Sequence, residues 1–270
     1  MNFSEAIGSH PNAPNPFGVH LTAVDEQTDD GVPHRLLKEG VSQPTGFAAV
    51  MRQWMITHHA SPEMLERDRL RIEATIRLGF GKPPNQVGRF PKNPNTKKGN
   101  WAEILLAEYL GSSCNANVPV YRLHYNPNVD QSMKGDDVLA FDLDSKPVRI
   151  LVGEAKFRST PSKKVVEDIV DALTRSHRVG IPVSLQFVAD RLFERGHADL
   201  GKKVERCSLL FALGQLRLDY VGLLVSDVDA PVHVRRNAKV SMHRLAILSL
   251  ALDDPEGMVS TCYRGLENQP

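Results

Sequence analysis

The spacing of hydrophobic residues along the chain predicts helices in both halves. Between Gly46 and His58 the apolar side chains recur every three or four residues, which places them on one face of a helix. Ser61 followed by Pro62 is typical of a helix start, and the helix that it opens extends to about Leu78. The same spacing predicts further helices over residues 100–110, 161–175 and parts of 183–214.

Alternation of apolar and polar residues predicts the strands. A hairpin is expected over residues 137–157, because two alternating runs flank a short polar segment there. Single strands are predicted over residues 19–24, 118–124, 219–225 and 243–251. From residue 100 onward, strands and helices alternate, which is typical of a layered α/β domain. The predicted fold class is therefore α/β.

Residues 81–99 separate the two halves of the chain. This segment contains four prolines and has no hydrophobic period, which favours a domain boundary. We predict a mostly helical N-terminal region over residues 1–85 and a second domain over residues 86–270. Since residues 1–80 contain no chemical motif, we expect them to pack apart from the sheet, as a helical subdomain or a partner-docking element. The basic residues of the break belong either to a solvated linker or to an arm that contacts phosphate: Lys82, Arg89, Lys92, Lys97 and Lys98.

The expected hairpin ends in a group of charged residues. Its segment, residues 134–158, reads KGDDVLAFDLDSKPVRILVGEAKFR. A turn centred on Ser145 and Lys146 would place Asp137 directly opposite Glu154. The hairpin would then be apolar on one face for most of its length and carry two carboxylates at its open end.

The register of the hairpin decides which aspartate belongs to this group. Strand residues alternate between the two faces, so Lys156 shares the face of Asp137 and Glu154. A slip of one residue would place Asp136 opposite Glu154 instead. Since Ser-Lys is not a preferred two-residue turn, both registers are open, and we favour the one with Asp137.

Two opposed carboxylates and a nearby ammonium are suited to metal-assisted hydrolysis. Neighbouring carboxylates repel each other unless a cation lies between them, and Mg²⁺, for which Mn²⁺ can substitute, prefers oxygen ligands. Asp137 and Glu154 are therefore predicted to be metal ligands that help to activate a water molecule. Lys156 is predicted to orient that water or to neutralise charge that develops on phosphate. Ordinary solvated charges at a hairpin end are the alternative.

The helix predicted over residues 100–110 supplies a third carboxylate. Its charged residues are Glu103 and Glu108, and Glu103 shares a helical stripe with three apolar residues: Leu106, Ala107 and Leu110. A carboxylate on an apolar stripe is costly unless it is paired or bound to a metal. We predict that Glu103 is a third metal ligand. The alternative is an acidic residue favoured by the dipole near the helix start.

These motifs resemble those of the PD-(D/E)xK nuclease superfamily. The superfamily combines a helix glutamate with an aspartate and a Glu-x-Lys motif on adjacent strands. The matching positions are Glu103, Gly135-Asp136-Asp137 and Gly153-Glu154-Ala155-Lys156. No proline precedes the aspartate, which the superfamily often tolerates. The resemblance implies a restriction-endonuclease-like α/β core in which Glu103, Asp137, Glu154 and Lys156 are catalytic.

A more specific resemblance is to the HamA family, the nuclease subunits of Hachiman antiphage defence systems. It is carried by KKGNWAEILLAEYL, KGDDVLAFD and VGEAKFR in this order, and covers roughly residues 95–270. This resemblance implies a bacterial two-subunit system. In such a system a large helicase, HamB, holds the nuclease subunit, which degrades DNA when the system is triggered.

Composition excludes several other classes of protein. A net charge of +1 does not fit a protein that coats nucleic acid, although a nuclease needs only a local basic surface. No stretch reaches the roughly 20 apolar residues of a membrane span, and no secretory leader is recognisable, so we expect a cytoplasmic protein. The three cysteines, Cys114, Cys207 and Cys262, are far apart and form no metal-binding pair.

The DNA-binding surface is expected around the charged end of the hairpin. The basic residues assigned to it are Lys97, Lys98, Lys134, Arg158, Lys163 and Lys164. Two alternatives remain beside a metal-dependent DNA endonuclease that is restrained by a helicase. One is a catalytically silent subunit that keeps the fold and regulates a helicase, and the other is an RNA-cleaving enzyme with the same site.

Overall fold

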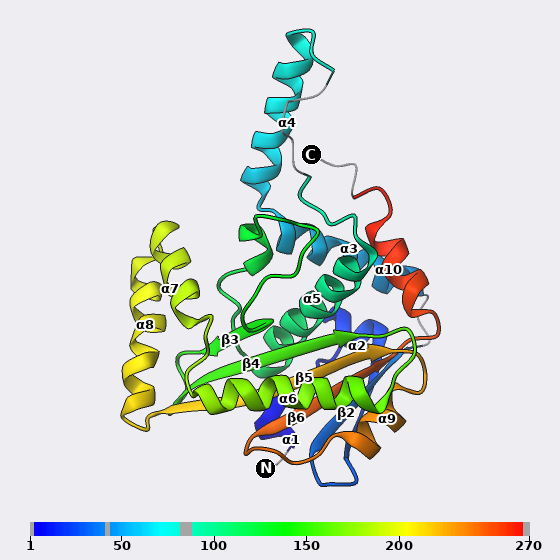
Figure 1. The fold of residues 1–270 in the computed structure, drawn as a ribbon, viewed down its shortest axis with the longest axis vertical. Helices are drawn as coiled ribbons and strands as arrows, with labels where there is room; N and C mark the ends of the chain where they lie inside the picture. Colours follow the sequence, from blue (N-terminus) through cyan, green and yellow to red (C-terminus); the bar gives the residue numbers. More distant parts are fainter. Residues whose placement is uncertain (1–2, 41–43, 82–87, 267–270) are drawn as a thin grey trace.

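A mixed sheet of six strands, with helices on both faces, organises the part of the chain that the structure describes, residues 3–40, 44–81 and 88–266 (Figure 1). The structure is a computed structural model. The strands are β1 (Leu21–Gln27), β2 (Pro33–Glu39), β3 (Val138–Asp142), β4 (Val148–Phe157), β5 (Leu216–Ser226) and β6 (Leu245–Ala251). They lie in the order β1-β2-β6-β5-β4-β3. Strands β2, β6, β5 and β4 are parallel, and each edge strand is antiparallel to its neighbour.

Helices cover both faces of the sheet, which confirms the predicted α/β class. One apolar core lies under α1 (Phe3–Ile7), α2 (Pro16–His20), α3 (Pro44–His59), α5 (Pro94–Cys114) and α10 (Pro255–Tyr263). The core on the other face lies under α6 (Lys163–Val179), α7 (Leu185–Glu194), α8 (Ala198–Ala212) and α9 (Ala230–Asn237). Within the described ranges, no helix is long and apolar enough to cross a membrane.

The N-terminal region takes part in the sheet, so the prediction that residues 1–80 pack apart from it is wrong. Strand β2 pairs with β6, and β1 extends the sheet beyond β2. Arg35 of β2 binds both carboxylate oxygens of Asp25 on β1 at 2.6 and 2.7 Å, and the hydroxyl of Tyr109 on α5 at 3.1 Å. These contacts tie the N-terminal strands to the rest of the core. No strand was predicted over β2, because its buried charges hide the apolar pattern.

Helix α4 (Pro62–Arg77) differs from the other long helices because none of its residues is buried. It projects from the body of the molecule (Figure 1). The predicted helix start is confirmed, since the Ser61 side chain accepts a hydrogen bond from the backbone of Met64 at 3.3 Å. Leu70 and Ile76 are 51% and 57% exposed. The helix therefore presents apolar side chains that nothing in the described chain covers.

The predicted break at 81–99 is shorter than expected. Helix α5 already begins at Pro94, where the side chain of Asn93 accepts hydrogen bonds from the backbone of the first turn. Lys97 and Lys98 consequently lie on α5 and not in a linker. Residues 82–87, which include Lys82, lie outside the described residues. Whether the break separates two functional regions stays a prediction.

The register predicted for the hairpin is confirmed. Val138 pairs with Gly153 and Asp142 with Arg149, so the next position places Asp137 opposite Glu154. The connection is longer than the two-residue turn that suggested this register, since it spans the whole segment between β3 and β4. The strand predicted over 118–124 is wrong. Only Asn117 forms a bridge, with Phe141, because proline follows at position 119 and lacks the backbone N–H that a longer ladder needs.

Gly153 allows α5 to approach β4 next to the charged end of the hairpin. A Cβ atom at this position would lie 2.8 Å from Cδ2 of Leu106 on α5 and 2.9 Å from Cβ of Val138 on β3. These distances are shorter than ordinary van der Waals contacts. The close packing fixes α5, and with it Glu103, against the strand that carries Glu154.

We predict that Gly153→Ala lowers the free energy of unfolding by about 1–3 kcal/mol, because the added methyl group forces α5 and β3 apart. Urea denaturation of the purified protein measures this change. Gly99→Ala is the matched control on α5, since its Cβ would meet nothing within 4 Å. Removing a helix glycine there should stabilise the protein by about 0.5–1 kcal/mol. An unchanged stability of Gly153→Ala would contradict the close packing.

Candidate functional site

Asp137 lies where β3 separates from β4. The last pair of the two strands is Val138 with Gly153, and Asp137 precedes it in the chain. Its Oδ2 atom accepts a hydrogen bond from the backbone N–H of Ala155 at 3.0 Å. The carboxylate thereby replaces a strand partner and remains at the edge of β4, next to Glu154.

Glu154 and Lys156 follow on the same strand, and their side chains form an ion pair. They continue the row of Ile150 and Val152, which are buried on the face covered by α6. The side chain of Glu154 is 15% exposed and that of Lys156 is 30% exposed. The apolar row therefore ends in a charged pair that solvent still reaches.

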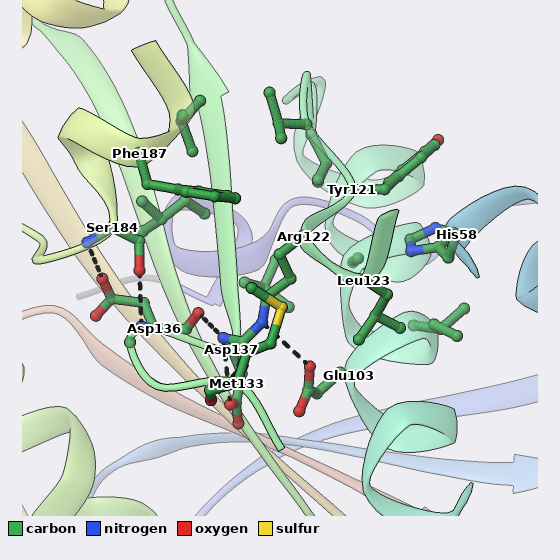
Figure 2. A pocket seen from close by; sticks show the side chains of 18 of the residues that line it. His58, Glu103, Tyr121, Arg122, Leu123, Met133, Asp136, Asp137, Ser184 and Phe187 are labelled. Carbon is green, nitrogen blue, oxygen red and sulfur yellow. Dashed lines mark hydrogen bonds and ion pairs between the residues drawn. The ribbon is translucent and has the colours of Figure 1, made fainter. Parts of the chain in front are cut away.

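Glu103 approaches the same place from α5. Its side chain is 11% exposed, and its Oε2 atom lies 3.7 Å from Nε of Arg122. Nη1 of Arg122 lies 3.8 Å from Oδ1 of Asp137, so one guanidinium lies between the two carboxylates (Figure 2). Glu108, the other acid of α5, binds Nε2 of His58 at 2.7 Å. The structure thus brings Glu103 to the site and places Glu108 elsewhere.

Asp136 points away from this group. Its carboxylate accepts hydrogen bonds from the hydroxyl of Ser176 at 3.1 Å and from the backbone N–H of Ser184 at 3.0 Å. The alternative register, with Asp136 opposite Glu154, is wrong, because the pairing of β3 with β4 places Asp137 there. Asp136 instead connects the loop before β3 to Ser176 on α6 and to Ser184 at the start of α7, and Figure 2 shows the second of these links.

Burial and mutual repulsion raise the pKa of all three carboxyl groups. For Glu103, burial and then the Asp137 carboxylate raise the pKa to about 8. Burial also raises the pKa of Asp137, although the bond from Ala155 opposes this shift. The pKa of Glu154 is raised by burial and by Asp137. Burial opposes the charge of Lys156, but Glu154, together with Asp137 and Glu103, outweighs it and raises the pKa of the ammonium.

The donor set fits a divalent cation. Glu103 Oε2 is buried and has no hydrogen-bond partner, and three carboxylates with raised pKa values converge there. A cation with oxygen preference would relieve both their repulsion and this unsatisfied atom. Among the residues that the structure describes, no three acidic, histidine or cysteine side chains are grouped so that they could hold a metal ion as they stand. The carboxylates would have to close around the ion.

A cavity of about 350 Å³ adjoins the carboxylates. Glu103, Arg122 and Asp137 line one side of it, and Tyr121 and Phe187 contribute aromatic walls (Figure 2). It lies between α5, the short 3-10 helix η1 (Arg122–Tyr125) and the start of α7. The charged group is therefore open to a space on the side of η1.

The six basic residues predicted to contact DNA come from four segments: the start of α5, the loop before β3, the end of β4 and the first turn of α6. The Nζ atom of Lys98 lies 5.8 Å from the ring centre of Phe157 and binds Glu256 at 2.6 Å. Lys163 and Lys164, in the first turn of α6, are 69% and 84% exposed. The others are Lys97 beside Lys98, Lys134 in the loop before β3, and Arg158 directly after β4. Their contact with DNA stays a prediction.

Comparison with known proteins places the chain in a family. The family model described as HamA matches residues 16–266. The chain belongs to the HamA family. It is also similar to the Hachiman protein HamA of Bacillus cereus, with 34% identity over 261 residues, which cover 96% of this chain and 93% of that protein. The resemblance found on three motifs thus extends over nearly the whole chain, N-terminal strands included.

Sequence reasoning missed Arg122. It lies in the segment mistaken for a strand, and no neighbouring motif marks it as part of the site. The arginine reaches the carboxylates only because Asn117 forms a single bridge and the chain then turns into η1. Ser176 and Ser184, which hold Asp136, also carried no signal.

The raised pKa of Glu103 predicts how the stability of the metal-free protein depends on pH. Between its ordinary value of 4.5 and about 8, the folded protein retains a proton that the unfolded chain releases. The free energy of unfolding should therefore fall as pH rises through this window. Glu103→Gln removes the titration and should flatten the fall, measured as melting temperatures between about pH 5 and about pH 8.5 with a chelator present.

Glu205→Gln, an exposed substitution on α8, serves as the control and should leave the pH profile of the wild type unchanged. Equal slopes for the wild type and Glu103→Gln would contradict the coupling of Glu103 to its neighbours.

Proposed function

We propose that this protein is a metal-dependent DNA endonuclease with a PD-(D/E)xK core, the effector subunit of a bacterial antiphage defence complex. The observation that carries the proposal is the convergence of Glu103, Asp137 and Glu154 at the split between β3 and β4, with Lys156 beside them. Three partly buried carboxylates with raised pKa values are costly to a fold that does not use them. Membership of the HamA family supports the same assignment.

In this proposal Glu103, Asp137 and Glu154 hold Mg²⁺, for which Mn²⁺ substitutes. The bound cation supplies a Lewis acid that makes a water molecule more acidic and neutralises charge on the phosphate. Glu154 also orients the ammonium of Lys156, with which it is paired. Lys156 then donates a hydrogen bond to the attacking water or to the phosphate, where negative charge develops. The basic residues around β4 orient the phosphate backbone.

DNA is the proposed substrate on the strength of the family resemblance. Phosphodiester cleavage by this site would be chemically similar on DNA and RNA, so the assay needs both. Purified protein with Mg²⁺ or Mn²⁺ should be incubated with plasmid, single-stranded DNA and RNA, with and without the partner helicase and ATP. Cleavage of RNA alone would replace DNA by RNA as the substrate, and no cleavage under any condition would favour the silent regulatory role.

We predict that Glu154→Ala and Lys156→Ala each lower the rate of DNA cleavage at least about 100-fold. The first removes a metal ligand, and the second removes the charge next to the attacking water. Both side chains are partly exposed, at 15% and 30%, so neither truncation opens a core cavity. Melting temperatures should stay within a few degrees of the wild type.

Lys202→Ala is the control for the loss of a lysine, because this residue is 69% exposed on α8, outside the site. It should cleave DNA like the wild type. Undiminished cleavage by Lys156→Ala would remove that residue from the mechanism.

The partner helicase is proposed to restrain the nuclease through α4. This helix projects from the body, buries none of its own residues and exposes Leu70 and Ile76 (Figure 1). Exposed apolar side chains on a projecting helix are typical of a surface that another protein covers. Deletion of residues 1–80 would not test this role, because it would also remove β1 and β2 from the sheet.

The double variant Leu70→Glu, Ile76→Glu should weaken binding of the purified helicase subunit at least about tenfold, because it introduces charge into the docking surface. Biolayer interferometry with the immobilised nuclease subunit measures the affinity. Leu209→Glu is the matched control, since Leu209 is 58% exposed on α8. Helicase binding by the double variant at wild-type affinity would exclude α4 as the docking helix. Cleavage by the wild type that is indifferent to the helicase would argue against restraint.

A further inference from the structure

Arg122 is held in the site by the loop that carries Asp137. Its guanidinium donates hydrogen bonds to two backbone carbonyls, that of Asp136 and, at 2.7 Å, that of Met133. The side chain is only 13% exposed. A buried arginine with its donors directed to this loop fixes the position of the residue that follows Asp136, which is Asp137.

Arg122 contacts the carboxylates through charge and not through hydrogen bonds, unlike its contacts with the loop carbonyls. Nε lies 3.7 Å from Glu103 Oε2, and Nη1 lies 3.8 Å from Asp137 Oδ1, so both distances exceed that of a hydrogen bond. Nε and Glu103 Oε2 are buried and have no hydrogen-bond partner. The guanidinium therefore neutralises the two acids by charge alone and leaves their oxygens available to another ligand.

Above the raised pKa of Glu103, where all three acids are ionised, the charges of the site nearly balance without any metal. Glu103, Asp137 and Glu154 carry three negative charges when ionised, while Arg122 and Lys156 carry two positive ones. A divalent cation would change this net charge from −1 to +1 unless one of the two side chains moves away. Lys156 is paired with Glu154, whereas Arg122 makes no hydrogen bond to either acid beside it. Release of Arg122 therefore breaks no hydrogen bond to an acid, although it breaks the two bonds to the carbonyls of Asp136 and Met133.

We infer that Arg122 is a resident counter-ion that occupies the place of the divalent cation between Glu103 and Asp137 and leaves when the metal binds. This inference rests on the metal site of the proposed function. It makes Arg122 a positioning residue, which keeps the acids close together in the metal-free protein and lowers the affinity of that protein for metal. Once released, the guanidinium is free to bind a phosphodiester, whose single negative charge matches its own positive charge.

The surroundings allow this exchange by rotation of one side chain. The backbone on both sides of Arg122 is fixed to α3, because the ring of Tyr121 lies 3.9 Å from that of His58, and His124 Nε2 binds the carbonyl oxygen of Thr57 at 2.7 Å. The adjoining cavity of about 350 Å³, which Arg122 itself lines, gives the guanidinium room (Figure 2). Helix η1 can thus stay in place while its arginine moves.

The test is the affinity of the full-length protein for Mn²⁺ without nucleic acid, measured from the electron paramagnetic resonance signal of free Mn²⁺. Arg122→Met removes the competing charge, so the dissociation constant should fall about tenfold. Arg69→Met is the matched control, because Arg69 is 52% exposed on α4 and forms its ion pairs outside the site. Its affinity should equal that of the wild type. Glu154→Gln identifies the site, since it should weaken Mn²⁺ binding in both backgrounds.

Arg122→Met can be less stable than the wild type, because its acids are left without their counter-ion. A second measurement therefore reads Mn²⁺ binding from the melting temperature. Mn²⁺ should raise the melting temperature of this variant by more than it raises that of the wild type. If Arg122 only anchors the loop, its loss would weaken Mn²⁺ binding. An unchanged or weaker affinity of Arg122→Met for Mn²⁺ therefore overturns the inference. That result would not contradict the proposed nuclease activity. Absence of Mn²⁺ binding at Glu154 in both proteins overturns the metal site and the inference together.

Discussion

Three carboxylates in one partly buried space impose a charge constraint on this structure. Glu103, Asp137 and Glu154 approach each other where β3 leaves β4, and burial raises the pKa of each. Negative charges at such a position need cations, and the protein provides Arg122 and Lys156. The packing of α5 on Gly153 holds Glu103 near this group, and the loop before β3 holds Arg122 there. The three acids are therefore already gathered at one place, although they would have to close around a cation to bind it.

The sheet connects the acids with the projecting helix α4 through α3 and α5. The acids lie at one side of the sheet, on β4, β3 and α5, while the N-terminal strands extend the other side. Helix α3 packs on α5 and also fixes η1, and α4 continues outward from it (Figure 1). A partner that held α4 would thus act on a helix that leads directly to the segment of Arg122.

Sequence patterns worked best where the physics is local. The N-cap of α4 at Ser61 and the period of α5 follow from neighbouring residues, and the structure has both. Sequence patterns failed where a residue that is unfavourable in its local segment is stabilised by groups from distant parts of the chain. Strand β2 carries the buried Arg35, which is stable only because Asp25 and Tyr109 meet it from other elements. Local patterns therefore place the N-terminal region apart from a sheet to which it contributes two strands.

The sequence by itself determined the residue types at the open end of the hairpin and favoured the register with Asp137. The pairing of β3 with β4 then decided between that register and the one with Asp136. The sequence also separated Glu103 from Glu108, since a helix places them on different stripes. Only the tertiary structure decided that Arg122 stands between Glu103 and Asp137 and that Asp136 faces Ser184. These contacts join residues far apart in the chain. They depend on how separate helices and strands pack, and a local sequence pattern carries no information on that packing.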